Sequence, residues 1–490
     1  MSILRKLASQ TAIYGLSSVL GRMLNYLLVP LYTSVFIPAE YGIVTELYAY
    51  VAFLNILFIY GLETAYFRFS SQEKGYNYFN LAFTSILISS LLFSGLIWIF
   101  SDAIAQTLQY PDKAHFIQWL AAILAIDAMV AIPFARLRQN GKATRFAVFK
   151  LSNIGVNILL NLFFILLCPM ILESNPNSFI RNVYNPGLGV GYVFLSNLIA
   201  NGLYLLFFIP DWLKVQITFN PVEWKRMMKY AWPVLIIGFA GVTNEMLSRA
   251  ILKYRLPEGF YEGYTNLEIL GIFGACYKLA VFMTLAVQAF RYAFEPFFFA
   301  QAKEKNSPQV FSQVMTWFVL FTSFSWLVLC VFMPYYATIF LRQDSYLMAL
   351  DAVPWLLGGG LFLGVFYNLS LWYKLTDKTL YGAYISLIGA FATFVLNWSL
   401  IPVFGYMGSA VATFGSYFLM VVISYLWGMK HYPVPYQVIK VISYVVLAGV
   451  GIAVDGLTEQ SFLKSVLIVL IFLTLPIILE RKAFQRLRAN

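Results

Sequence analysis

The chain has 490 residues, of which 60% are hydrophobic and 11% are charged, whereas soluble globular proteins carry about 25% charged residues. A membrane-spanning helix needs roughly 20 apolar residues, and runs of that length recur from residue 9 to residue 480 with short polar breaks. The composition therefore indicates an integral membrane protein and excludes a large soluble domain. A basic face beside anionic lipid explains the net charge of +11, so nucleic acid is not expected as a partner.

Apolar windows bounded by charged residues, Pro or Gly predict an all-α polytopic protein with about fourteen membrane-spanning helices. The first begins after a basic start without a small-residue cleavage site, so we interpret it as a helix and not as a signal peptide. The predicted spans lie at about 9–30, 43–64, 81–101, 115–135, 147–170, 188–210, 231–251, 268–290, 314–335, 350–373, 381–402, 406–427, 438–454 and 462–480.

The basic residues divide unevenly between the two sides of these spans. With the N-terminus inside, the inner segments hold 24 of the 33 Lys and Arg residues, and the outer loops hold seven. Because cytoplasmic loops retain excess positive charge, both termini are predicted to be cytoplasmic. The two remaining cations, Arg22 and Lys278, fall inside predicted spans.

The first predicted span has one polar face, formed by residues at steps of three and four. Its members are Thr11, Gly15, Ser18, Arg22 and Asn25. The seventh span repeats the arrangement with Gly238, Gly241, Glu245 and either Ser248 or Arg249. We therefore expect two parallel six-helix repeats and two extra helices, with the substrate site at the interface of the repeats. Helix packing alone explains the Gly and Ser positions, but it does not explain Arg22.

The domain boundaries that follow from this repeat are an N-lobe at 1–210, a cytoplasmic linker at 211–230 and a C-lobe at 231–430. Residues 431–490 hold the two extra helices and a basic cytoplasmic tail.

Cations at mid-membrane depth are the candidate substrate-binding residues. Burying an arginine at a helix centre costs at least about 2.5 to 3.5 kcal/mol, so Arg22 needs a partner, water or an anionic ligand. Lys278 lies ten residues after Glu268 and thirteen before Arg291, with a carboxylate such as Asp127 or Glu245 as its alternative partner.

Arg249 is the third candidate cation, although Glu245 lies one turn earlier in a favourable position for a local ion pair. Asn25 and Ser18 share the face of Arg22. Arginine binds phosphate oxygens by forked hydrogen bonds and lysine acts as a point charge, so these five residues predict a cavity for a phosphate-bearing head group.

Three carboxylates in or near the spans are candidates for coupling transport to H⁺ or Na⁺: Glu63, Asp127 and Glu245. A different interpretation of Glu63 is a contact with Arg68 that fixes the inner end of the second span.

The sequence resembles the bacterial polysaccharide-biosynthesis flippases, the O-antigen and lipid-linked oligosaccharide translocases of the multidrug/oligosaccharidyl-lipid/polysaccharide exporter superfamily. The similar stretches are LGRMLNYLLVPLYTSVFIPAEYGIVTELYAY at 20–50, YGLETAYFRF at 60–69, LGIFGACYKLAVFM at 270–283, FEPFFFAQAKEK at 294–305 and NWSLIPVFGYMGSAVAT at 397–413. None of them is a catalytic motif, so the resemblance depends on their order and spacing.

The resemblance implies a MATE-like bundle of two six-helix lobes around a central cavity, with two trailing helices that form a groove for a lipid tail. It implies a flippase of the bacterial inner membrane that moves a polyprenyl-pyrophosphate-linked oligosaccharide from the cytoplasmic to the outer leaflet by alternating access. Arg22 would contact the pyrophosphate and Lys278 would assist. The implied partners are this lipid-linked oligosaccharide, membrane lipids and the polymerase or ligase machinery of lipopolysaccharide and other surface polysaccharides.

Three other functions are compatible with parts of the sequence. A peptidoglycan-precursor flippase has similar chemistry and two extra helices, whereas a cation-coupled drug exporter would be expected to have acidic residues in its cavity. A membrane polymerase or glycosyltransferase generally needs a larger outer loop than any here, so we expect no catalytic residues. The spacing of the three cysteines and two histidines predicts no metal site, and no nucleotide motif or other cofactor site is expected.

Overall fold

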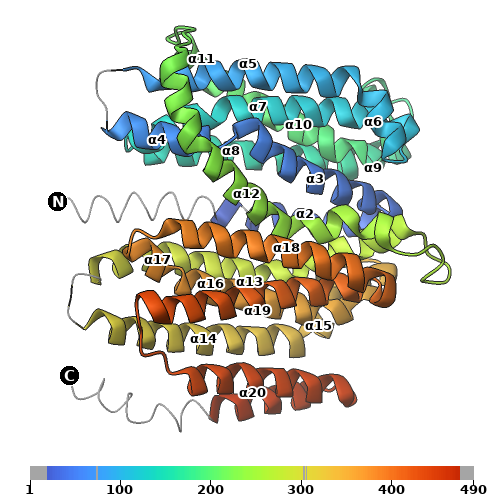
Figure 1. Cartoon of the computed structure of the whole chain (residues 1–490). Helices are drawn as coiled ribbons and strands as arrows, with labels where there is room; N and C mark the ends of the chain where they lie inside the picture. Colours follow the sequence, from blue (N-terminus) through green and yellow to red (C-terminus); the bar gives the residue numbers. More distant parts are fainter. Residues whose placement is uncertain (1–18, 22, 73–75, 302–303, 305, 475–490) are drawn as a thin grey trace. The chain divides into compact units, whose positions relative to one another are not determined.

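The computed structural model describes residues 19–21, 23–72, 76–301, 304 and 306–474, and the regular elements within these residues are helices (Figure 1). Contacts within the chain divide it into two compact units, Met1–Ala250 and Ile251–Asn490. We call them unit 1 and unit 2 and describe each by itself.

Unit 1 contains eleven α-helices within the described residues, the last of which continues five residues beyond Ala250. They are α2 (Leu28–Val35), α3 (Pro38–Ile59), α4 (Leu62–Gln72), α5 (Tyr78–Ile99), α6 (Ser101–Thr107), α7 (Ala114–Gln139), α8 (Ala143–Asn161), α9 (Cys168–Ser174), α10 (Gly191–Phe207), α11 (Ile209–Trp212) and α12 (Pro221–Arg255). A π-helical segment, η2 (Leu162–Leu167), joins α8 to α9, and short 3₁₀ turns lie at η1 (Pro111–Lys113), η3 (Phe179–Asn182) and η4 (Pro186–Leu188).

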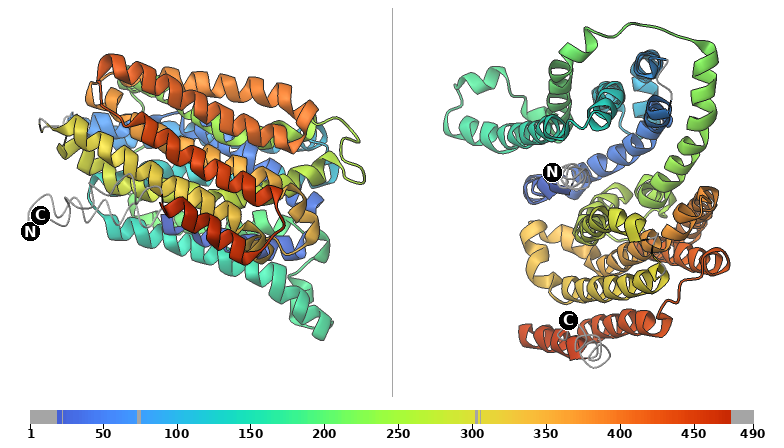
Figure 2. Two further views of the ribbon diagram at one scale, coloured as in Figure 1. Left: turned by 90° about the horizontal axis from the view of Figure 1, so that it is seen from below. Right: turned by 90° about the vertical axis from the view of Figure 1, so that its left-hand side faces the viewer.

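Unit 2 contains the remaining described helices. They are α13 (Asn266–Gln301), α14 (Ser307–Val331), α15 (Met333–Phe340), the 3₁₀ segment η5 (Asp344–Ala352), α16 (Val353–Leu369), α17 (Leu371–Leu375), α18 (Thr379–Phe404), α19 (Tyr406–His431), α20 (Val438–Leu457) and a last apolar helix at Phe462–Thr474. Figure 2 shows α20 and this last helix beside α14, which α20 contacts along its length.

The membrane-spanning character of the chain is confirmed. Within the described residues, eleven helices are long and apolar enough to cross a bilayer, and Gly191–Phe207 and Phe462–Thr474 are shorter apolar helices. These thirteen segments match thirteen of the fourteen predicted spans. The agreement is expected, because a helix pairs its backbone hydrogen-bonding groups within one segment and long apolar runs in lipid therefore become helices. The first predicted span, at 9–30, lies mostly outside the described residues.

The second predicted span is two helices instead of one. Tyr60 and Gly61 have φ angles of 35° and 75°, in the left-handed region that ends a helix, and they separate α3 from α4. Gly61 is required here, since a Cβ atom on it would lie 2.5 Å from the carbonyl oxygen of Ala231 in α12. The break therefore lies at a close contact between two spans, which apolar periodicity does not reveal.

Local signals explain where several helices begin. The Thr265 hydroxyl accepts a hydrogen bond from the Glu268 N–H, and the Glu268 carboxylate accepts one from the Thr265 N–H at 2.7 Å, which is a capping box before α13. Pro38 and Pro221 occupy the first position of α3 and α12, where a missing N–H costs nothing.

Glycines place α16 at the centre of unit 2. Added Cβ atoms at Gly358, Gly360 and Gly364 would lie 2.8 Å from Phe414, 2.9 Å from Met283 and 2.6 Å from Phe318. These contacts involve α19, α13 and α14, so small residues on several faces allow three helices to approach one.

The contact boundary between the units does not coincide with the predicted linker. The predicted linker at 211–230 contains the end of α11 and the first turns of α12, and α12 continues without a break to Arg255. The N-lobe, linker and C-lobe boundaries that follow from the sequence repeat therefore remain predictions.

Candidate functional site

The predicted substrate-binding residues have different places in the structure. Ser18 and Arg22 lie outside the described residues. Asn25 has an exposed side chain shortly before α2, and Lys278 is half-buried near the middle of the membrane-spanning part of α13. Arg249 is buried, with 7% of its surface exposed, on α12. Of the described residues, Lys278 belongs to unit 2, and Asn25 and Arg249 belong to unit 1.

The predicted ion pair between Glu245 and Arg249 is wrong. The Arg249 Nη2 donates a hydrogen bond of 2.7 Å to the Glu245 backbone carbonyl, and the Glu245 side chain is exposed. Arg249 therefore helps to hold its own helix turn.

The predicted contact between Glu63 and Arg68 is also wrong. The Glu63 carboxylate pairs with Arg138 at the end of α7, while the Arg68 guanidinium lies 4.4 Å from the centre of the Tyr230 ring. Glu63 pairs with Arg138 instead of Arg68 because α4 packs against α7, which brings the two side chains together. Glu63 thus joins two helices of unit 1.

Asp127 is the candidate coupling carboxylate with the most developed surroundings. It lies at the midpoint of α7, and its Oδ1 accepts a hydrogen bond of 3.0 Å from the Asn201 Nδ2 on α10. The Asn201 Oδ1 in turn accepts a bond of 2.9 Å from the Asn153 Nδ2 on α8. Three spans therefore meet at one chain of polar side chains near the middle of α7.

Lys150 completes this group from α8. Its Nζ lies 4.5 Å from the centre of the Phe134 ring and 5.4 Å from that of the Tyr204 ring, and it interacts electrostatically with Asp127. Aromatic faces attract a cation, so the two rings hold the ammonium in place. We call Asp127, Lys150, Asn153 and Asn201 the polar core of unit 1.

The same face of α8 continues toward its C-terminal end. The Asn161 Nδ2 donates to the Asn157 Oδ1 at 3.2 Å, and the Tyr32 hydroxyl donates to the Asn161 Oδ1 at 2.9 Å. Asn153, Asn157 and Asn161 are spaced by four residues, which is a signal that the sequence contained and that our prediction missed.

Glu46 is a second functional candidate that sequence reasoning missed. It is completely buried in α3, and its carboxylate accepts hydrogen bonds from the hydroxyls of Tyr50, at 3.2 Å, and Tyr110. Its position inside a predicted span was the available signal. Burying a carboxylate costs free energy even when two phenols hydrogen-bond to it, so its presence indicates a structural or functional requirement for this residue.

An apolar groove of 430 Å³ lies in unit 2 between α14, α16, α19 and α20. Its lining is entirely apolar in character, with Met315, Phe362 and Phe418 on one side and Val441 and Val445 of α20 on the other. We call it the apolar groove. It exists because α20, the first of the two extra helices, packs on α14.

A larger cavity of 800 Å³ lies in unit 1 between α3, α5 and α12. Leucine, isoleucine and phenylalanine side chains form most of its wall. Polar groups gather at one place, where the Ser85 hydroxyl accepts a hydrogen bond of 2.8 Å from the Trp224 Nε1 and lies 2.8 Å from the Tyr60 hydroxyl. This cavity can hold an apolar chain.

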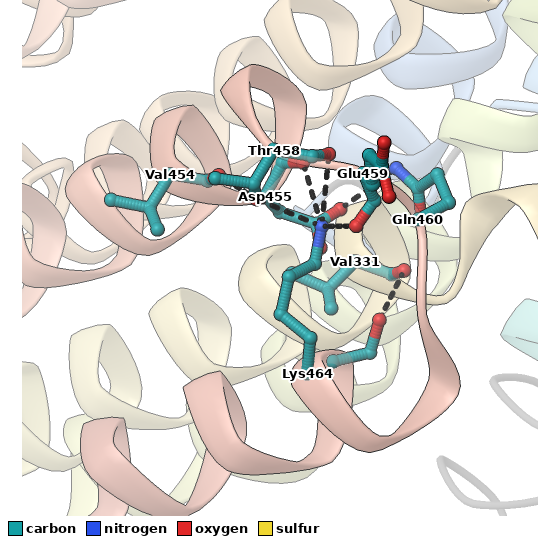
Figure 3. Close-up of polar contacts among 8 residues, drawn as sticks. Val331, Val454, Asp455, Thr458, Glu459, Gln460 and Lys464 are labelled. Carbon is teal, nitrogen blue, oxygen red and sulfur yellow. Dashed lines mark hydrogen bonds and ion pairs between the residues drawn. The ribbon is translucent and has the colours of Figure 1, made fainter.

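The turn after α20 is held by a single ammonium group (Figure 3). The Lys464 Nζ donates to the carbonyl oxygens of Asp455, Thr458 and Glu459 at 2.8–3.2 Å, and it lies 3.1 Å from the Asp455 carboxylate. The next residue, Ser465, donates to the carbonyl oxygen of Val331 in α14 at 3.4 Å. These contacts fix the hairpin of the two extra helices against α14, beside the apolar groove.

The described residues contain no group of three or more His, Cys, Asp or Glu side chains arranged to hold a metal ion. The three cysteines, Cys168, Cys276 and Cys330, are buried free thiols.

Comparison with solved structures identifies the fold. The structure described as "Lipid II flippase MurJ, inward closed conformation" superimposes with a TM-score of 0.70, at 14% identity over 96% of this chain and 99% of that one. The Vibrio cholerae MATE transporter VcmN, in the form of a point mutant, gives a TM-score of 0.58, at 15% identity over 86% of this chain and 96% of that one. An inward-facing multidrug resistance MATE family transporter of the MOP superfamily gives 0.54, at 15% identity over 86% and 94%.

Comparison of the sequence itself gives the family. A search of curated protein sequences finds no match. The family model described as "Polysaccharide biosynthesis protein" matches residues 7–299, which is more than half of the chain. With its multi-pass, all-helical MATE- and MurJ-like fold, the chain is a membrane transporter that belongs to the polysaccharide biosynthesis protein family.

Proposed function

We propose that this protein is a flippase that moves a polyprenyl-pyrophosphate-linked oligosaccharide from the cytoplasmic to the outer leaflet of the bacterial inner membrane by alternating access. The product would supply cell-surface polysaccharide, such as the O-antigen of lipopolysaccharide, to a polymerase or ligase. Both termini are cytoplasmic in this proposal, as the distribution of Lys and Arg favours.

The apolar groove is the observation that carries the proposal. A polyprenyl chain is long and entirely apolar, so it needs a continuous apolar surface beside the bundle while its head group crosses. The groove has that character, and α20 forms one of its walls. The MATE-family structures match 86% of this chain, whereas the lipid II flippase matches 96%.

The head group would bind to the cations predicted from the sequence. We propose that Arg22 and Lys278 contact the pyrophosphate, that Arg249 adds positive charge, and that Ser18 and Asn25 provide neutral hydrogen bonds. Arginine and lysine favour a phosphate-bearing ligand because charge-assisted hydrogen bonds are about twice as strong as neutral ones.

A peptidoglycan-precursor flippase is the second candidate function, favoured by the fold similarity to the lipid II flippase. The same chemistry, a polyprenyl pyrophosphate carrying a glycan, would suit both functions. A drug exporter is less well supported, since the apolar groove has no role in the export of a small cation.

The test is transport by the purified protein in proteoliposomes that contain fluorescent lipid-linked substrates of both kinds. Flipping of the polyprenyl-pyrophosphate oligosaccharide without flipping of lipid II supports the proposal. The opposite preference makes the chain a peptidoglycan-precursor flippase, and drug transport without lipid flipping would overturn both.

Variants of Arg22 test the head-group contact. We expect Arg22→Ala to reduce flipping by about tenfold or more, and Arg22→Lys to retain part of the rate because the charge remains. Monodispersity in detergent serves as the folding control. Normal flipping by both variants would show that Arg22 is structural and would remove it from the proposed site.

A further inference from the structure

We propose that the 800 Å³ cavity of unit 1 binds one acyl chain of an anionic phospholipid, whose ester group lies at Ser85 and whose phosphate faces Lys225 and Lys229. This inference does not depend on the proposed transport function. It follows from the length of the cavity, the polar groups at one end of it and the charges beside that end.

The length of the cavity matches an acyl chain. Its wall on α5 runs from Ser85 to Ile97, which is about 18 Å at 1.5 Å per residue. One leaflet supplies about 15 Å, half of the 30 Å hydrocarbon core of a bilayer. The wall residues Leu57 and Leu92 are 41% and 58% exposed, so the cavity is open to a chain from the surrounding lipid. A polyprenyl chain is much longer and would extend beyond the cavity.

The apolar wall ends at a cluster of four polar side chains that all line the cavity: Tyr60, Ser85, Ser89 and Trp224. Ser85, which is 7% exposed, accepts a hydrogen bond of 2.8 Å from the Trp224 Nε1, and its hydroxyl lies 2.8 Å from that of Tyr60. The Ser89 hydroxyl donates to the Tyr60 hydroxyl at 3.3 Å. The cavity therefore has one polar and one apolar end, as the ester region and the chain of a phospholipid have.

This cluster can offer one hydrogen-bond donor to a ligand. When Ser89 donates to Tyr60 and Tyr60 donates to Ser85, the Ser85 oxygen also accepts from Trp224 and its own proton is left for a further acceptor. An ester carbonyl has lone pairs and no proton, so it can accept this hydrogen bond. A pure hydrocarbon cannot.

The backbone of Tyr60 points to a requirement for its side chain. Its φ angle of 35° lies in the left-handed region, where glycine is the usual residue at the end of a helix and a bulky residue is an outlier. A glycine there would relieve the backbone but would remove the hydroxyl from the cavity. Backbone strain of this kind is found at ligand-binding sites, where the side chain is needed.

Two exposed lysines stand beside the polar end. Lys225 and Lys229 lie one turn apart at the start of α12. Glu223, in the same part of the helix, is paired with Arg226 at 2.8 Å, so it does not cancel the charge of the two lysines. Basic residues at the end of a membrane span attract anionic lipid head groups. They therefore favour a phospholipid with a net negative charge over a zwitterionic one.

The experiment measures phospholipid binding to the delipidated full chain in detergent by native mass spectrometry, without lipid-linked oligosaccharide, so failure of the proposed flippase function would not alter it. We expect one phosphatidylglycerol to bind wild type about tenfold more tightly than phosphatidylcholine with the same acyl chains. Lys225→Gln/Lys229→Gln should remove this preference. Lys378→Gln/Lys430→Gln, which changes two exposed lysines of unit 2, should keep it.

Variants of the wall test where the chain binds. Leu92→Trp puts a ring into the cavity, and we expect it to weaken phosphatidylglycerol binding by about tenfold. Leu91→Trp is the matched control, because Leu91 is 59% exposed on the same helix but is not part of the cavity wall. An ether-linked phosphatidylglycerol, which lacks the ester carbonyl, should bind wild type more weakly than the ester lipid and bind Ser85→Ala equally well.

Three results would overturn the proposal. They are equal binding of the two phospholipids by wild type, unchanged phosphatidylglycerol binding by folded Leu92→Trp, and displacement of the phospholipid by an equal concentration of polyprenyl phosphate. The last result would assign the cavity to the tail of a polyprenyl lipid.

If the variants do not fold, photolabelling of wild type decides. Phosphatidylglycerol with a diazirine on its acyl chain should label α5 between Ser85 and Ile97, and unlabelled phosphatidylglycerol should prevent the labelling. Labels confined to other parts of the chain would contradict the proposal.

Discussion

Individual charged residues in this protein are satisfied mainly by groups far away in the sequence. Glu63 pairs with Arg138 and not with Arg68, and Asp127 accepts a hydrogen bond from Asn201. Sequence spacing identifies which residues share a helix face, but it cannot identify partners on other helices. Glu63, Asp127 and Glu245 could be chosen from the sequence, whereas Glu46 was missed and the partners on other helices could not be predicted.

Lys464 provides a test at this scale. We expect Lys464→Met to lower the free energy of unfolding by about 2 kcal/mol, because it leaves the buried Asp455 carboxylate and three carbonyl oxygens without their ammonium donor. Thermal unfolding in detergent measures the loss. The double variant Lys464→Met/Asp455→Asn should recover part of it, and no recovery would mean that the ion pair contributes little.

Whole helices were the most predictable level of the structure. The predicted spans at 381–402 and 406–427 correspond to α18 and α19, which begin within two residues of the predicted positions. Uninterrupted apolar runs bounded by Gly, Pro or charge leave little freedom in a membrane, since an unpaired backbone group is costly there. The break between α3 and α4 escaped prediction because it depends on packing against α12.

Close helix packing around α16 gives a second test. Gly364→Ala places a methyl group 2.6 Å from Phe318 and 2.7 Å from Val287, so we expect a loss of about 1–3 kcal/mol in unfolding free energy. The control is Gly449→Ala in α20, where the nearest atom lies 3.8 Å away and little change is expected. Equal thermal stability of the two variants would contradict the packing argument.

At the level of the whole molecule, the two extra helices provide an apolar surface that the proposed flippase function would use. Their hairpin is fixed by Lys464 and Ser465, and α20 forms one wall of the apolar groove. The fold similarity extends over nearly all of the lipid II flippase and over less of this chain for the MATE transporters. The apolar groove is therefore the part of the molecule in which we propose that the lipid tail binds.

Filling the apolar groove tests this role. Val445→Trp puts a large ring into the groove, and we expect flipping of a full-length polyprenyl substrate to fall by about tenfold while a short-prenyl analogue is moved normally. Val454→Trp, on the same helix but outside the groove lining, is the matched control. Equal loss for both chain lengths would show that the groove does not hold the tail.

The sequence by itself determined the class of protein, nearly all of the membrane-spanning helices and the family resemblance. These depend on composition, on apolar run length and on residue order, which are local properties. Only the tertiary structure decided that Glu63 pairs with Arg138, that the buried Glu46 carboxylate accepts a hydrogen bond from Tyr110 and that Asn201 donates to Asp127. Such partners come from different helices, and their meeting depends on how the helices pack, which short-range patterns do not encode.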